Sequence, residues 1–442
     1  MRILHAMVVC ALLVAAAPAY AGGPLFIGSA RLGHDGQPLT WNPAAMPIPY
    51  RVDSGPLSVT PNGTVAINNS TGVTRVSSMF SVWSAPTANI TFANGGSLLR
   101  SGAFSGGDAA TVSDFDALTA SCDNVEQNPI IFDADGSLFA ALVGDPSVIG
   151  FAGACQVQGG YISSAMAVLN GIFQDGVDTG TNYELTLAEF DQAFSHEFGH
   201  FIGLDHSQIN VSVLASQTCA SDVNAGLPLM FPVLICPARI SSGLPALAPD
   251  DKAWVSRLYP GASFATQYGK ITGRIYYSDG KTQMQGINVI AMKANDQTRE
   301  AYSAVSGQAF TTVPGQTVTP IPSSSDFGSH DRTLIGYYEI PVPPGAYVVK
   351  AESISPYFVY GSSVGPFAVP MVLQGPSEFW NVAESATDNP FASDTVNVNA
   401  GQTVQGIDII INATPATFDD AESPTAEDIP PEALFGEEGR LA

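Results

Sequence analysis

The sequence predicts an α+β protein, in which a small twisted sheet packs on long helices and an all-β sandwich follows. A helix is indicated at about 187–202, because Thr186 and Glu189 have the spacing of a capping box and apolar residues recur behind them at helical period. Short alternating strands separated by Gly and Pro turns occupy residues 266–414, a rhythm typical of a sandwich. A chain of 442 residues has room for two or three domains.

In chain order we expect five segments. A signal peptide at 1–21 and a leader or short pro-segment at 22–45 precede the helix-containing domain at 46–262. The sandwich at 266–414 is followed by a tail at 415–442, which we expect to be disordered because it is rich in acids and prolines.

The first 21 residues have an early arginine, an apolar run from Ala6 to Ala17 and a small-x-small sequence ending at Ala21. These features are typical of a cleaved secretory signal peptide. No later stretch reaches the ~18 apolar residues that span a bilayer. We therefore expect a secreted, extracellular protein without membrane insertion.

Cleavage of the signal peptide would leave Cys122, Cys155, Cys219 and Cys236, an even number in an oxidising destination. Four cysteines allow three pairings. We favour Cys122–Cys155 with Cys219–Cys236, because each pair closes a local loop. A free thiol that inhibits a metal is the alternative.

Residues 196–206 carry the clearest chemical pattern, H-E-x-x-H-x-x-G-x-x-H. His196 and His200 are four residues apart, so they lie on one face of a helix. Gly203 can adopt the left-handed conformation that ends a helix, which lets His206 supply a third nitrogen. Three protein ligands with a fourth position left to water describe a catalytic zinc site, and Glu197 is placed to act as its general base.

Other interpretations of this pattern are weaker. Histidines on an ordinary surface helix would not require the glycine or the third histidine. A zinc site that takes its third ligand from a glutamate on a later helix is nearly excluded, because no glutamate lies between Glu197 and Glu300. Asp205 is a conceivable third ligand, but His206 has the spacing that the motif demands, so we expect Asp205 to fix the loop instead.

The stretch 196–207 resembles the zinc helix of the metzincin clan, and within it the matrixins (matrix metalloproteinases and their bacterial relatives). Residues 228–232 resemble the methionine turn of that family, which implies that Met230 forms an apolar floor beneath the zinc. Residues 247–259 resemble its C-terminal helix, and residues 48–52 and 80–92 its first strands and helix. The resemblance covers about 46–260. The chain departs from the family in two ways, since it lacks a propeptide cysteine switch and has a longer segment from Ser207 to Pro228.

This resemblance implies a zinc-dependent endopeptidase, in which His196, His200 and His206 hold one Zn²⁺ and Glu197 deprotonates the attacking water. It also implies that residues 231–246 shape the pocket after the scissile bond. The alternative from another class is a non-catalytic surface or adhesion protein that retains the zinc-binding peptidase scaffold. A zinc hydrolase acting on non-peptide substrates is a third interpretation.

Three further features are expected, the first two from the resemblance to the matrixins. Residues 161–167 are expected to form an edge strand that binds an extended substrate, although an ordinary buried strand remains an alternative. Asp133-Ala134-Asp135-Gly136 suits a structural Ca²⁺, but it also suits an ordinary turn. The strands of 266–414 resemble a carboxypeptidase regulatory-like sandwich, which implies a spacer or a binding surface.

Composition restricts the partners. The chain has 40 acidic and 16 basic residues, a formal net charge of -24. Nucleic acids and anionic membranes both require basic patches, so neither is expected as a partner. We expect a monomer that acts on a protein or peptide substrate.

Overall fold

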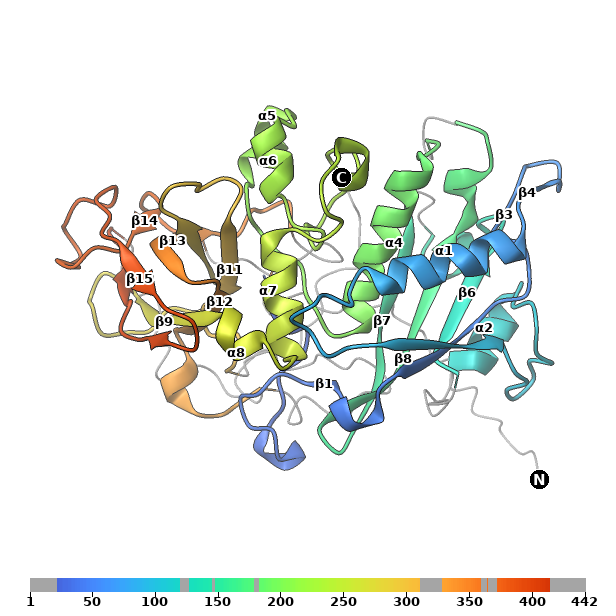
Figure 1. The fold of residues 1–442 in the computed structure, drawn as a ribbon, viewed down its shortest axis with the longest axis horizontal. Helices are drawn as coiled ribbons and strands as arrows, with labels where there is room; N and C mark the ends of the chain where they lie inside the picture. The colour runs from blue at the N-terminus through green and yellow to red at the C-terminus, as the bar shows by residue number, and fades with distance from the viewer. Residues whose placement is uncertain are drawn as a thin grey trace, which may run out of the picture.

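The structure, a computed structural model, describes residues 22–119, 127–144, 148–178, 183–310, 328–358, 364 and 372–413. These residues form an α+β protein with several sheets and few helices, as the sequence predicts (Figure 1). The signal peptide, Cys122 and the acidic tail lie outside the described residues. Within the described ranges, no helix is both long and apolar enough to cross a membrane.

The first half of the chain is built on a six-stranded sheet with the order β1-β8-β6-β2-β5, in which β7 lies beside β8. All neighbours are parallel except β7 and β8, which are antiparallel. The strands are β1 (Thr40–Trp41), β2 (Ile48–Val52), β5 (Phe92–Ser97), β6 (Pro129–Asp133), β7 (Gly150–Gln158) and β8 (Tyr161–Asn170). A small hairpin of β3 (Ser58–Val59) and β4 (Val65–Ile67) completes this half.

Strand β6 is apolar and buried along its whole length because the sheet is covered on both faces. Ile130 and Phe132 belong to the main apolar cluster, whereas Ile131 belongs to a second cluster with residues of α2 (Val112–Thr119) and α3 (Ser137–Leu142). Successive side chains of a strand point to opposite faces, so the two clusters lie on the two sides of the sheet.

The expectation that residues 161–167 form an edge strand is wrong. Strand β8 is flanked by β7 on one side and by β1 and β6 on the other. Gly159 and Gly160 both have positive φ angles, of 60° and 80°, which only glycine adopts without strain, and they turn the chain tightly back from β7. Among the described strands, the Gly- and Ala-rich strand β7 pairs with β8 alone and is the outermost on this side, a position that its composition did not indicate.

Two long helices pack on the sheet: α1 (Asn69–Ser81) and α4 (Leu187–Phe201) (Figure 1). The predicted capping box at the start of α4 is confirmed, because the Glu189 backbone N–H donates to Thr186 Oγ1 and the Thr186 N–H donates to Glu189 Oε2. Phe80 of α1 and Phe198 of α4 stack with ring centroids 3.9 Å apart and planes 2° from parallel. This contact joins the two helices within the core.

The second half contains a five-stranded sheet, order β11-β10-β13-β14 with β15 on β13, and a four-stranded sheet, order β12-β9-β16 with β17 on β9. The strands are β9 (Gly269–Tyr276), β10 (Ile287–Lys293), β11 (Ala301–Val305), β12 (Tyr337–Val342), β13 (Gly345–Ser353), β14 (Glu378–Phe379), β15 (Val396–Val398), β16 (Thr403–Val404) and β17 (Ile409–Ile410). Apolar residues of both sheets share one buried core. We refer to residues 269–413 as the β-half.

The two halves meet through α7 (Pro249–Leu258), which lies between them (Figure 1). Trp254 of α7 donates from Nε1 to the carbonyl oxygen of Ser303 at 2.8 Å, and Arg257 forms an ion pair with Glu339 at 2.6 Å. Residues 22–45, expected to be a leader, also lie in this core, because Leu25, Leu39 and Trp41 are buried there. The apolar core is therefore continuous through both halves.

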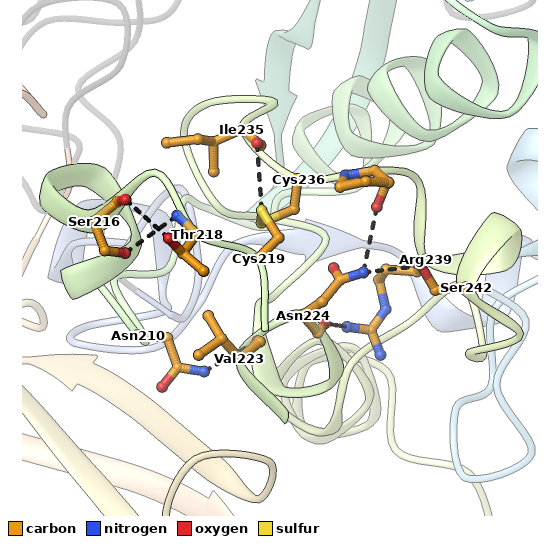
Figure 2. The surroundings of a disulfide bond; sticks show 11 residues. Asn210, Ser216, Thr218, Cys219, Val223, Asn224, Ile235, Cys236, Arg239 and Ser242 are labelled. Carbon is orange, nitrogen blue, oxygen red and sulfur yellow. Dashed lines mark hydrogen bonds between the residues drawn. A yellow bond between two sulfur atoms is a disulfide. The ribbon is translucent and has the colours of Figure 1, made fainter. Parts of the chain in front are cut away.

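Two short α-helices and one disulfide lie between α4 and α7. The helices are α5 (Ser212–Ser216) and α6 (Ser221–Gly226), and a third short helix, α8 (Phe264–Gln267), follows α7. The predicted Cys219–Cys236 disulfide is confirmed, with an S–S distance of 2.03 Å (Figure 2). Cys155 is also disulfide-bonded, while its expected partner Cys122 lies outside the described residues.

Replacing Phe80 with alanine should destabilise the protein by about 3–5 kcal/mol, because it opens a cavity in a packed aromatic core. The free energy of unfolding in urea would measure the loss. Phe391→Ala, at a side chain that is 69% exposed, is the control and should change stability little. Equal effects of the two substitutions would contradict the role given to this stack.

Candidate metal centre

Three histidine side chains converge on one point. His196 and His200 lie on α4, and His206 follows in the loop after the helix. Their Nε2 atoms are 3.2 Å (His196–His200), 3.1 Å (His200–His206) and 3.1 Å (His196–His206) apart. Gly203, with φ +84°, turns the chain back after the helix and so brings the third ring to the other two.

The proton positions of two rings follow from their partners. Nδ1 of His196 lies 2.7 Å from the carbonyl oxygen of Leu229, and Nδ1 of His200 lies 2.9 Å from that of Leu204. A carbonyl only accepts, so each Nδ1 carries the proton and donates it. Both Nε2 atoms therefore present lone pairs to the common point, where they cannot hydrogen-bond to each other.

Burial keeps these imidazoles neutral. It lowers the pKa of His196 to about 4, against a weaker opposing effect of the bond to Leu229. Burial, together with the neighbouring His196, lowers the pKa of His200 to about 3. At neutral pH the rings are thus in the form that binds metals.

The arrangement fits a zinc ion. Nitrogens bound tetrahedrally to zinc at 2.0–2.1 Å are about 3.3–3.4 Å apart, close to the separations observed. Lone pairs held this near each other repel, and a cation placed between them removes the repulsion. Among the described residues, these histidines form the one group of three or more His, Cys, Asp or Glu side chains with ligand atoms within 4.8 Å of one another.

The residues of the site differ in exposure. His200 and His206 are buried, whereas parts of His196 and of the neighbouring Glu197 reach the surface. Three protein ligands leave the fourth tetrahedral position of a zinc ion to another ligand, as in catalytic rather than structural zinc sites.

The carboxylate of Glu197 lies between α4 and the outer strand of the sheet. Its Oε2 accepts a hydrogen bond from the backbone N–H of Ala152 on β7, at 3.0 Å. Burial raises the pKa of Glu197 to about 8, and the bond from Ala152 opposes this only in part. The carboxyl is therefore poised to gain and lose a proton near neutral pH.

Met230 lies beneath the metal-binding helix. It is 2% exposed, and a Cβ atom built on Gly199 would lie 2.3 Å from its Sδ atom and 2.8 Å from Cζ2 of Trp83. Only glycine fits at position 199, between the two helical ligands. The family resemblance implied an apolar floor beneath the zinc, and the structure places Met230 against Gly199 of the helix that carries two of the ligands.

The turn that contains Met230 is held by Asp251 of α7, a residue that the sequence alone did not single out. Its carboxylate accepts the backbone N–H groups of Leu229 at 2.8 Å and Met230 at 3.0 Å. The carbonyl of Leu229 orients His196, so Asp251 acts on the site through the turn. The sequence signal was the pair of acids after Pro249, which also suits an ordinary helix N-terminus.

Asp205 fixes the loop, as expected. It is buried, and its Oδ1 accepts the backbone N–H of His206 at 2.5 Å.

The candidate calcium residues also accept backbone hydrogen bonds. Asp133 accepts the N–H of Phe139 at 2.8 Å and Asp135 that of Ser137 at 3.0 Å, which matches the turn interpretation. Calcium at this position stays an untested prediction.

The segment after the methionine turn is tightly held. Arg239 donates from Nη1 to the carbonyl oxygens of Asn224 and Leu227, each at 2.8 Å, and its backbone N–H donates to Gln192 of α4 at 2.7 Å. Figure 2 shows Arg239 and Asn224 beside the Cys219–Cys236 disulfide. These hydrogen bonds and the disulfide link residues of the segment 219–239 to one another and to the metal-binding helix.

Comparison with known proteins gives little guidance. No family model matches the chain, and no curated protein matches it. Among solved structures, the major pilin subunit of Bacillus cereus is similar at 14% identity, with a TM-score of 0.17. That similarity covers 33% of this chain and 30% of the pilin, so the chain spans less than a third of the pilin's length.

Replacing His206 with alanine should abolish stable metal binding, because two neutral imidazoles hold zinc far less tightly than three. Metal content after incubation with zinc and dialysis would be measured by elemental analysis. His330→Ala, at an exposed histidine, is the matched control and should retain one zinc. Retention of zinc by both variants would contradict the assigned centre.

The metal-free protein should lose stability at alkaline pH because of Glu197. Its folded pKa, about 8, lies above the ordinary value of 4.5. The protonated form is favoured in the folded state. Its contribution to the free energy of unfolding is therefore full below about pH 4.5 and is lost as the pH rises through 8. Glu197→Gln should therefore melt above the wild type near pH 9 and close to it near pH 5. Equal differences in melting temperature between the variant and the wild type at pH 5 and pH 9 would contradict a raised pKa of Glu197.

Proposed function

We propose that this protein is a zinc-dependent endopeptidase of the metzincin type, similar to the matrixins. One observation carries the proposal: three histidine Nε2 atoms converge at 3.1–3.2 Å, and a partly exposed carboxyl adjoins the first of them. The spacing H-E-x-x-H-x-x-G-x-x-H places these groups on one helix and the turn after it.

A zinc ion, when bound, lowers the pKa of water and polarises a carbonyl group. Glu197 accepts a proton from the attacking water and then donates it to the leaving amine. A bound cation lowers the pKa of a neighbouring carboxyl group, which favours the carboxylate form that accepts the proton. The N–H of Ala152 donates to the carboxylate and holds it beside β7.

We propose that the extended substrate lies along β7 rather than β8. Among the described strands, β7 pairs with β8 alone, so its other edge is available for a peptide to add to the sheet. The catalytic carboxyl is hydrogen-bonded to this same strand, which would bring a scissile bond paired with β7 to the metal centre. Residues 231–246 follow the methionine turn and would receive the side chain after that bond.

We further propose that the enzyme is secreted. The Cys219–Cys236 disulfide is of the kind that persists in an oxidising compartment. No observation in the described residues specifically favours the adhesion alternative, and the three converging histidines beside Glu197 support the catalytic proposal.

Replacing Glu197 with glutamine should leave zinc bound but lower kcat for peptide hydrolysis by about 10²–10⁴-fold, because the variant cannot accept a proton. Zinc content and cleavage of denatured casein would be measured for both proteins. Asp205→Asn, at a carboxylate that accepts the backbone N–H of His206, is the comparison and should retain most of the activity. Undiminished cleavage by Glu197→Gln would contradict the mechanism, whereas no zinc in either protein would refute the metal centre itself.

A further inference from the structure

We propose that the β-half holds the third metal ligand in place, with Asn288 and Ser303 as positioning residues for His206. This inference rests on the proposed metal centre. It gives the β-half a direct role at the site, in place of the spacer or binding surface that its resemblance to a regulatory-like sandwich implied.

His206 differs from the other two ligands in how its backbone is supported. The main-chain hydrogen bonds of α4 fix His196 and His200, whereas residues 205–209 have no regular secondary structure. A ligand on such a segment keeps its position only through tertiary contacts. The two residues that follow it, Ser207 and Gln208, are both fully buried.

Gln208 is bound by the β-half through every polar group of its side chain. Its Nε2 donates to Glu352 Oε1 and to the carbonyl oxygen of Ser353, each at 2.9 Å. Its Oε1 accepts the N–H of Ser355 at 2.6 Å. Its main-chain carbonyl accepts a bond from Asn288 Nδ2 at 2.8 Å. The backbone two residues beyond the ligand is therefore tied to strands β10 and β13.

Ser207 is tied to the β-half as well. Its hydroxyl oxygen lies 2.9 Å from that of Ser303 on β11, and its N–H donates to the carbonyl oxygen of Met230 at 2.8 Å. The N–H of Ser303 in turn donates to Asp250 Oδ1 at 2.9 Å. Ser303 thus joins the ligand loop to α7, the helix that also holds the methionine turn.

An apolar contact supports the neighbouring segment. Phe231, directly after Met230, meets Phe358 of the β-half edge to face, with ring centroids 5.3 Å apart. The two rings belong to a separate buried cluster that also contains residues of both halves. The loop carrying His206 and the turn carrying Met230 therefore both rest on the β-half.

Two substitutions separate positioning from general stability. Asn288→Leu keeps the branched shape and the number of side-chain heavy atoms, and it removes the bonds from Nδ2 to Gln208 and to Glu352. It also removes an Oδ1 atom that is buried without a partner. The Gln208 carbonyl loses this donor, so some loss of stability is expected, and the melting temperature measures it separately. Ser303→Ala removes only a hydroxyl group. Thr272→Val is the matched control, because it removes a buried hydroxyl of β9 that bonds to Val404.

The dissociation constant for zinc would be measured by competition with a chromogenic chelator, using the full chain, beside the melting temperature of each metal-free protein. Removal of groups that orient metal ligands typically weakens metal binding 10–100-fold. We expect the dissociation constant for zinc to rise about tenfold or more in the Asn288→Leu/Ser303→Ala double variant. The visible spectrum of its cobalt-substituted form should also change. Thr272→Val should stay within about twofold of the wild type.

An unchanged dissociation constant and cobalt spectrum in the folded double variant would overturn the inference. So would an equal loss of affinity in Thr272→Val. If the double variant does not fold, Ser303→Ala alone decides by the same measurements. A wild-type protein that takes up no zinc would instead refute the proposed function, so the two failures are distinguishable.

Discussion

The geometry of the site depends on two backbone carbonyl groups. Leu229 and Leu204 accept the Nδ1 protons of His196 and His200 and thereby turn both Nε2 lone pairs toward His206. Without these acceptors the rings could rotate or exchange protons, and the three nitrogens would not be held within 3.2 Å of one another. Both carbonyls belong to segments outside α4. The metal-binding helix is therefore aligned by its surroundings as much as by its own spacing.

Those surroundings form a series of contacts that runs back into the protein. Asp251 holds the turn whose carbonyl orients His196, and Ser303 joins α7 to the loop that carries His206. The β-half belongs to this support, since its residues hydrogen-bond to the polar groups of the Gln208 side chain. The apolar core likewise continues through both halves, so the polar contacts of this loop lie within one packed interior.

Several carboxyl groups lie in this buried region, in a chain of net charge -24. Burial raises the pKa of Asp250 to about 8 and that of Asp251 above its ordinary value. Backbone N–H groups of Leu229, Met230 and Ser303 oppose these shifts by donating to the two carboxylates. The acids thus serve as acceptors for backbone groups that a purely apolar core would leave unsatisfied.

The local features could be read from the sequence, because helix caps, helical spacing and strand rhythm depend on near neighbours. The sequence predicted the start of α4, the three histidines, the strand-rich character of the β-half and the Cys219–Cys236 pair. The folded chain was needed to show that β7 lies outside β8, that Asp251 and Ala152 contact the site, and that Ser303 meets Ser207. These contacts join residues far apart in the chain, such as positions 207 and 303, and no local period encodes which distant strand or loop a side chain will meet.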